Sequence, residues 1–254
     1  MDNLKIIADA YEAEIEVVEF LPYLLQDLWA LGSYPDQTVE EILSLNLPKE
    51  TTRILDLGCG KGILGISLAK RFGYKVKGID AFSSFIEFAK EKSKEYNVSN
   101  HTEFVCGDIK EMIENESGYT VAVLSSVGQI WGSYTSTIKK IRECVLPGGY
   151  IILEEGFLVE NSGIENQNYI SYESIVNQIT AAGDEIVKET IFPGEWLIEL
   201  NKQNNKFIQQ RAAELYEKYP GKAEIIKQYA HRQIAECEFL EKNFRSAMWV
   251  LKKI

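Results

Sequence analysis

The sequence has few of the residues that build metal sites and disulfide frameworks. It contains four cysteines and two histidines in 254 residues, and no two cysteines form a Cys-x-x-Cys pair. This spacing offers no zinc constellation, so we expect no metal and four reduced cysteines. Only six prolines occur, and no segment has the biased composition of a disordered linker.

Long apolar runs and an excess of basic charge are also missing. No stretch approaches the roughly eighteen apolar residues of a membrane span, and the amino terminus lacks the pattern of a secretion signal. We therefore predict a cytoplasmic protein with no membrane partner. Lysine and arginine number 27 against 38 acidic residues, a net charge of −11. That balance disfavours a surface that neutralises phosphates, so nucleic acid is not an expected partner.

From residue 53 onward, short apolar runs alternate with amphipathic stretches. This alternation is typical of βαβ units around a mainly parallel sheet. The pattern predicts strands at 53–57, 75–79, 102–106, 121–125, 150–154, 185–192 and 247–252. It predicts helices at 63–71, 84–96, 109–113, 133–143 and 171–182, and a turn at 146–149.

Helical periodicity marks the segments outside this sheet. The first 48 residues are predicted as helices, including one over 38–45 that begins with a capping box of Thr38 and Glu41. About fifty residues separate the last two strands, too many for an ordinary connection, and Pro220-Gly221 divides them into two helical halves. The predicted organisation is a helical cap from 1–48 and the insertion 201–243, a ligand-binding domain over 49–200, and a closing strand within 244–254.

A glycine-rich turn follows the first strand, in the segment Ile-Leu-Asp-Leu-Gly-Cys-Gly-Lys-Gly over 54–62. Glycine lets the backbone approach a ligand closely, and the helix start behind it offers free N–H groups. The spacing also fits a dinucleotide fingerprint, with Asp80 about twenty residues on, so an NAD-linked oxidoreductase stays open as an alternative. Asp56 argues against it, because a carboxylate there would repel a pyrophosphate and attract an ammonium.

Four segments in register resemble the motifs of class I S-adenosylmethionine-dependent methyltransferases. They are Asp-Leu-Gly-Cys-Gly-Lys-Gly at 56–62, Val-Lys-Gly-Ile-Asp at 76–80, Phe-Val-Cys-Gly-Asp-Ile at 104–109 and Leu-Pro-Gly-Gly-Tyr at 146–150. The resemblance implies an α/β fold with a Rossmann-like, seven-stranded, mainly parallel sheet. Its order would be 3-2-1-4-5-7-6, with the last strand antiparallel, helices on both faces and a helical cap.

The resemblance implies S-adenosyl-L-methionine as the cofactor, bound at the carboxyl ends of the strands. It places Asp80 at the ribose hydroxyls and Asp108 at the adenine amino group. The full set of cofactor-binding residues implied is Asp56, Gly58, Cys59, Gly60, Gly62, Asp80, Ala81, Asp108, Ile109, Ser125 and Ser126. A non-methylating enzyme with the same cofactor, and a binding module, remain as alternatives.

The methyl acceptor is expected to face the loop after the fourth strand. This loop lacks the Asn-Pro-Pro-Tyr or Asp-Pro-Pro-Tyr sequence of methyltransferases that act on nucleobase or glutamine amides, which disfavours those acceptors. The acidic composition and the expected cap favour a small-molecule acceptor, and the sulfonium leaving group implies in-line displacement. The candidates are Glu154, Glu155 and Gln129 as catalytic residues, and Trp131, Tyr134, Tyr23 and Trp29 as substrate or lid residues. A carboxylate could attract an amine or take its proton, and strand alternation turns only one of the two glutamates inward. Trp131 could equally well serve packing, and the aromatic residues of the cap could form a homodimer contact.

Overall fold

The computed structural model describes residues 3–160, 162–164 and 170–254, which divide into two compact units. The helical unit combines Met1–Trp29 with Pro193–Arg245, and the sheet unit combines Ala30–Phe192 with Ser246–Ile254. Residues 30–48, which we expected among the cap helices, therefore belong with the sheet. Val39 and Ile42 explain this placement, because both are fully buried in a helix that packs on the first helix after the glycine-rich turn.

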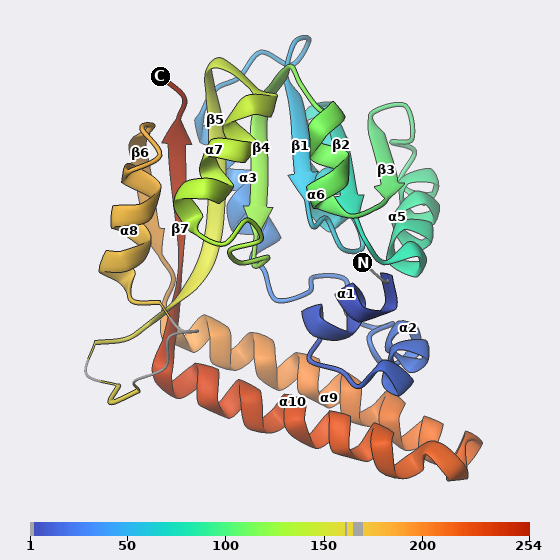
Figure 1. Ribbon diagram of the computed structural model, residues 1–254. Coiled ribbons are helices and arrows are strands. Elements are labelled where there is room, and N and C mark those ends of the chain that lie inside the picture. The colour runs from blue at the N-terminus through green and yellow to red at the C-terminus, as the bar shows by residue number, and fades with distance from the viewer. Residues whose placement is uncertain (1–2, 161, 165–169) are drawn as a thin grey trace. The chain divides into compact units, whose positions relative to one another are not determined.

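Seven strands in the order β3-β2-β1-β4-β5-β7-β6 form the core of the sheet unit (Figure 1). The strands are β1 (Arg53–Leu57), β2 (Lys75–Asp80), β3 (Thr102–Cys106), β4 (Tyr119–Ser125), β5 (Val145–Leu158), β6 (Glu185–Ile191) and β7 (Phe244–Lys252). The first five pair in parallel, whereas β6 and β7 pair antiparallel. The predicted sheet order and the antiparallel closing strand are confirmed.

Helices lie on both faces of this sheet. They are α3 (Pro35–Ser44), α4 (Ile63–Phe72), α5 (Ser83–Glu95), α6 (Ile109–Met112), the 3-10 turn η2 (Ile113–Asn115), α7 (Tyr134–Cys144) and α8 (Tyr172–Thr180). In Figure 1, α7 lies in front of the strands and α3 behind them. Under α7 and α8, the fully buried Leu55, Ile138, Ile175 and Trp249 share one apolar core cluster. The buried alternate residues of the central strands are what hold these helices against the sheet.

Two local predictions in the sheet unit are wrong. The helix predicted over 38–45 begins at Pro35, a favourable residue for the first helical turn. Thr38 lies inside that helix and donates its hydroxyl to the carbonyl of Tyr34 at 3.2 Å, so it forms no capping box. The turn predicted at 146–149 is instead part of β5, where the register against β4 shifts between Tyr119 and Val121.

The helical unit contains a long helical hairpin, as predicted. Its elements are α1 (Asn3–Ala10), η1 (Ile15–Phe20), α2 (Leu21–Leu24), α9 (Gly194–Lys218), η3 (Pro220–Lys222) and α10 (Ala223–Asn243). Helices α9 and α10 run side by side and reverse direction at Pro220 (Figure 1). No helix within the described ranges is long and apolar enough to cross a membrane.

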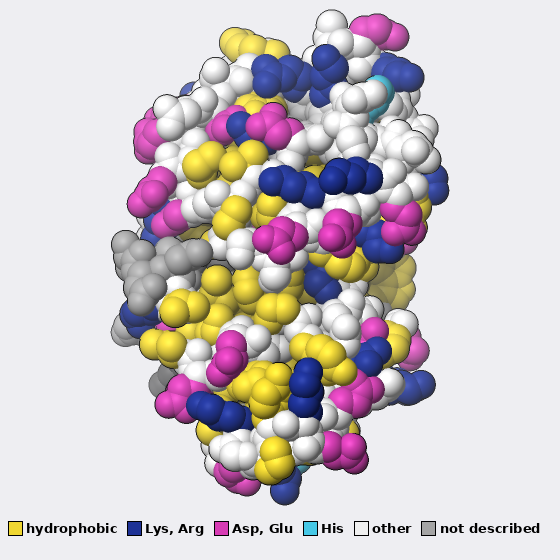
Figure 2. Space-filling model, turned by 90° about the vertical axis from the view of Figure 1, so that its right-hand side faces the viewer, with side chains coloured by type: hydrophobic (Ala, Val, Ile, Leu, Met, Phe, Trp, Pro, Cys, Tyr) yellow, Lys and Arg dark blue, Asp and Glu magenta, His cyan; other side chains and the backbone are white. Residues whose placement is uncertain are grey.

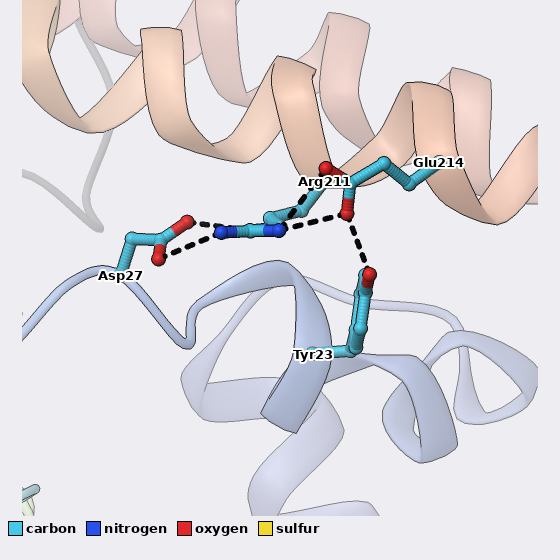
Figure 3. A network of polar contacts seen from close by, with 4 residues as sticks. All are labelled: Tyr23, Asp27, Arg211 and Glu214. Carbon is cyan, nitrogen blue, oxygen red and sulfur yellow. Dashed lines mark hydrogen bonds and ion pairs between the residues drawn. The ribbon is translucent and has the colours of Figure 1, made fainter.

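One polar network joins the N-terminal segment to α9 within the helical unit (Figure 3). The Arg211 guanidinium donates to both carboxylate oxygens of Asp27, at 2.5 and 3.0 Å, and to those of Glu214 at 3.0 and 2.8 Å. The Tyr23 hydroxyl donates to Glu214 at 2.5 Å. Bidentate guanidinium–carboxylate pairs fix orientation as well as contributing energy. Tyr23, predicted as a lid residue, thus has a structural role in tying α2 to α9.

Candidate functional site

The turn after β1 adopts backbone conformations that favour glycine. Gly58, Gly60 and Gly62 have φ values of 76°, 51° and 74°, in the left-handed region. The Gly58 N–H donates to the carbonyl of Ile79 at 2.8 Å, which ties the turn to the end of β2. Gly62 caps α4, so the turn delivers the unpaired N–H groups of a helix start to the carboxyl edge of the sheet.

Side chains from neighbouring elements leave no space for a Cβ atom at two of these glycines. A Cβ on Gly58 would lie 2.5 Å from Cγ2 of Val127, in the loop after β4. A Cβ on Gly62 would lie 2.7 Å from Cζ of Phe104 on β3. The turn is therefore packed tightly between the ends of three strands.

Replacing Gly58 with alanine is expected to lower the unfolding temperature by at least about 2 °C beyond the cost of positive φ, because overpacking costs about 1–3 kcal/mol. Gly148→Ala is the matched control, since Gly148 has a φ of 74° and no atom within 4 Å of an added Cβ. Thermal unfolding followed by circular dichroism measures both variants. Equal unfolding temperatures for the two variants would show that the Val127 side chain moves aside without loss of stability.

Asp80, the last residue of β2, links the ends of the first two strands. Its Oδ2 accepts a hydrogen bond from the Gly60 N–H at 2.8 Å, and its Oδ1 accepts one from the Phe82 N–H at 2.9 Å. Burial raises the pKa of this carboxyl, and the two backbone hydrogen bonds oppose the rise. Each oxygen keeps a further lone pair, so the carboxylate can still accept two hydroxyl donors from a ligand.

Asp56 lies one strand away, inside β1, and is only 4% exposed. Burial, followed by the charge of Asp80, raises the pKa of Asp56 to about 7. A cationic group bound beside it would favour the ionised form and lower that pKa. The two acids thus make the carboxyl edge of β1 and β2 a site suited to a ligand with both hydroxyl and ammonium groups.

Three further cofactor candidates, which follow β1 and β3 in the chain, occupy more structural positions. Asp108 caps α6 and its Oδ1 accepts from the Lys110 N–H at 2.9 Å. Ile109 packs against the main apolar core. Burial raises the pKa of the Cys59 thiol well above its usual range, with the charges of nearby acids adding to the effect. A neutral, buried thiol of this kind packs rather than reacts.

Glu154, a predicted catalytic residue on β5, already has partners at the start of α3. Its Oε1 accepts from the Tyr34 N–H at 3.0 Å, and its Oε2 accepts from the Thr38 hydroxyl at 3.4 Å. Burial raises its pKa to about 7 despite these hydrogen bonds. The sequence contained no local signal for this contact, because Tyr34 and Glu154 are 120 positions apart. Glu154 is therefore engaged in holding α3 on the sheet.

Glu155 has a separate set of partners, around the loop after β4. Its Oε1 accepts from the Gly156 N–H at 3.0 Å. Burial raises the pKa of Glu155, and polar contacts with Gly156, Tyr134 and Gly128 oppose the rise. Burial and the charge of Glu155 in turn raise the pKa of the Tyr134 phenol. Of the two glutamates, Glu155 is the one that the structure brings to the predicted acceptor loop.

The loop after β4 is anchored on both sides. Ser125 ends β4 opposite Glu154, and Ser126, with a φ of 56°, donates its N–H to the Glu154 carbonyl at 2.9 Å. The Ser126 hydroxyl donates to the Gly32 carbonyl at 2.8 Å. Trp131 is half-buried and packs against the apolar core, in line with the packing alternative considered for it. Gln129 is also half-buried. Of the predicted lid residues, Tyr23 and Trp29 belong to the helical unit.

Comparisons with known proteins match the segment that contains the glycine-rich turn and Asp80 to a methyltransferase domain. Residues 54–149 match the family model described as a methyltransferase domain. A malonyl-[acyl-carrier protein] O-methyltransferase of Priestia megaterium is 34% identical over 111 residues, which cover 43% of this chain and 39% of that protein. A carboxy-S-adenosyl-L-methionine synthase of Shewanella piezotolerans is 30% identical over 123 residues, covering 45% of this chain and 49% of the relative. The matched segment is thus less than half the length of either relative.

The fold comparison extends beyond the matched segment. A crystal structure of an S-adenosylmethionine-dependent methyltransferase from Thiobacillus denitrificans, in complex with S-adenosyl-L-homocysteine, superposes with a TM-score of 0.76. The alignment covers 92% of this chain and 98% of the other at 18% sequence identity. This similarity concerns the fold alone. It agrees with the predicted strand order.

Proposed function

Because this chain carries a class I S-adenosylmethionine-dependent methyltransferase domain, we propose that it binds S-adenosyl-L-methionine and methylates a small-molecule acceptor. The observation that carries the proposal is the arrangement of Asp80, whose two oxygens accept from the turn after β1 and the turn after β2. This carboxylate is fixed in place before any ligand arrives and keeps acceptor capacity for a pair of ribose hydroxyls.

The other candidate residues fit the remaining parts of the cofactor. Asp56 would face the ammonium of the methionine moiety. Its pKa of about 7 in the absence of a cation means that the carboxyl would ionise readily when the ammonium binds. The turn of Gly58, Gly60 and Gly62 would lie against the same moiety. Asp108 would accept from the adenine amino group through the lone pairs that its cap bond leaves free. Cys59, Ala81, Ile109, Ser125 and Ser126 would supply backbone or packing contacts.

The bound cofactor would supply a methyl group already activated by its positively charged sulfur. An acceptor lone pair held in line with the carbon–sulfur bond would receive that methyl group, and the electron pair of the broken bond would stay on sulfur. The protein's main task is to align the acceptor with that bond. Glu155, beside the loop of Gln129, Trp131 and Tyr134, is the residue we propose to hold an amine acceptor or take its proton.

Three observations bear on the alternatives. The similarity to a relative named carboxy-S-adenosyl-L-methionine synthase keeps a non-methylating use of the same cofactor open. The buried Asp56 disfavours an NAD pyrophosphate at the glycine-rich turn. The net charge of −11 supports a small molecule over nucleic acid. The cytoplasmic location and a homodimer contact through the cap remain predictions.

The proposal is tested by measuring S-adenosylhomocysteine release with pools of primary amines, phenols, thiols and carboxylic acids. We expect one pool to raise turnover, and Glu155→Gln to lower kcat by about a hundredfold or more with little change in cofactor affinity, because a lost general base typically costs that much. Glu154→Gln is the matched control, since its carboxyl binds α3. Conversion of the cofactor to a product other than S-adenosylhomocysteine, or cofactor binding with no conversion, would refute methyl transfer.

A further inference from the structure

The sheet unit has a cavity at the edge opposite the carboxyl ends of the strands. It measures about 400 Å³, and its walls come from the segments that precede β1, β2 and β3. Its lining includes Lys49 before β1, Lys70 and Arg71 at the end of α4, and His101 before β3. Its volume is in the range of small-molecule sites.

The lining of this cavity is basic, in contrast to the rest of the chain. It contains three cationic side chains and no Asp or Glu, although the whole protein has a net charge of −11. Figure 2 shows dark blue side chains gathered beside a histidine at the top of the view. Concentrated charge of one sign in a concave site attracts ligands of the opposite sign.

Several of these groups can donate hydrogen bonds to an anion. Arg71 pairs with Glu40 through one nitrogen at 2.6 Å, which leaves other guanidinium donors. The Lys70 ammonium lies 4.3 Å from the ring centroid of Tyr96, a contact that leaves its hydrogens accessible. Nδ1 of His101 is buried and makes no hydrogen bond within the described part of the chain. The remaining donors of Lys70 and Arg71 can bind ligand oxygens.

We propose that this cavity binds a small molecule that carries two or more phosphate groups. The three cations come from two segments, Lys49 before β1 and Lys70 with Arg71 at the end of α4, and they line one concavity. Several cations around one concavity suit a compact multivalent anion rather than a single carboxylate. A long nucleic acid would have to extend past the exposed acidic residues Glu50, Glu95 and Glu103 that flank the cavity segments, where like charges repel it.

The cavity and the proposed cofactor site are independent positions. β2 spans Lys75–Asp80, so Gly73 in the cavity wall and Asp80 at the cofactor site are separated by the length of the strand, about 20 Å at roughly 3.3 Å per residue. The anion would therefore bind whether or not S-adenosylmethionine is present.

Isothermal titration of the full chain with inorganic pyrophosphate tests the proposal. We expect saturable binding that Lys49→Glu combined with Lys70→Glu weakens at least tenfold. Lys139→Glu combined with Lys90→Glu reverses the same number of charges at exposed positions of α7 and α5, and this control is expected to change the affinity less than twofold. Asp80→Ala should leave pyrophosphate binding intact, which separates this site from the proposed function.

Three results would overturn the proposal. One is the absence of saturable pyrophosphate binding at low salt. Another is equal weakening by the control charge reversals, which would indicate attraction without a site. The third is tighter binding of a single-stranded RNA oligonucleotide than of pyrophosphate, with the same sensitivity to Lys49 and Lys70, which would assign the surface to nucleic acid.

Discussion

Replacing Asp80 with alanine is expected to weaken binding of S-adenosylmethionine by at least about a hundredfold. The change removes two hydrogen bonds to a charged acceptor from the ligand, each worth about 1.5–3 kcal/mol. It also removes the acceptor for the Gly60 and Phe82 N–H groups, so the turn after β1 loses one of its ties to β2. Isothermal titration with S-adenosylhomocysteine measures the effect directly.

Two controls make this result specific. Asp36→Ala, at an exposed position in the first turn of α3, carries the same charge change away from the site and should leave the affinity unchanged. Circular dichroism of the Asp80→Ala variant should show an intact fold. A folded variant with undiminished affinity would exclude Asp80 as a cofactor ligand and remove the observation on which the proposed function rests.

Raising the pH from 5 to 8 is expected to destabilise the wild type relative to Glu154→Gln. The pKa of Glu154 rises from 4.5 to about 7 on folding, because burial outweighs its hydrogen bonds to Tyr34 and Thr38. A carboxyl with a raised pKa favours the folded state most when it is protonated, so its contribution is complete below about pH 4.5 and is lost as the pH passes 7. The full difference corresponds to about 3 kcal/mol.

Urea unfolding at pH 5, 6, 7 and 8 tests this dependence. Glutamine keeps an oxygen for the Tyr34 N–H and cannot ionise, so the variant should gain stability relative to the wild type across the series. Glu50→Gln, at an exposed position, should follow the wild type at every pH. A Glu154→Gln variant that is equally destabilised at all four pH values would show that the buried carboxyl is ionised throughout.

Much of the fold followed from local sequence signals. Strands at 53–57 and 102–106 begin and end where the apolar runs do, and the hairpin turn lies at Pro220-Gly221 as expected. These elements are specified by neighbouring residues, through alternation, helical period and helix-breaking pairs. The glycine-rich turn is likewise specified by neighbouring residues, since Gly58, Gly60 and Gly62 predict the turn that the structure contains.

The features that sequence could not predict depend on distant contacts. Gly148 and Gly149 signalled a turn, yet their backbone groups pair with Lys253, whose N–H donates to Gly149 at 2.8 Å and whose carbonyl accepts from Gly148 at 3.0 Å. That tertiary pairing extends β5 through a segment that reads locally as a loop. The distinction between Glu154 and Glu155 likewise depends on Tyr34 and Tyr134, which no local pattern connects to β5.

The central claim is that the carboxyl edge of β1 and β2 binds an adenosyl cofactor with an amino-acid moiety. Thermal unfolding with S-adenosylmethionine, S-adenosylhomocysteine and NAD, each at about a hundred times the expected dissociation constant, tests it most directly. The two adenosyl ligands should raise the unfolding temperature by about 5–10 °C, since such saturation adds about 2.7 kcal/mol, and NAD should have no effect. Stabilisation by NAD alone would contradict the claim.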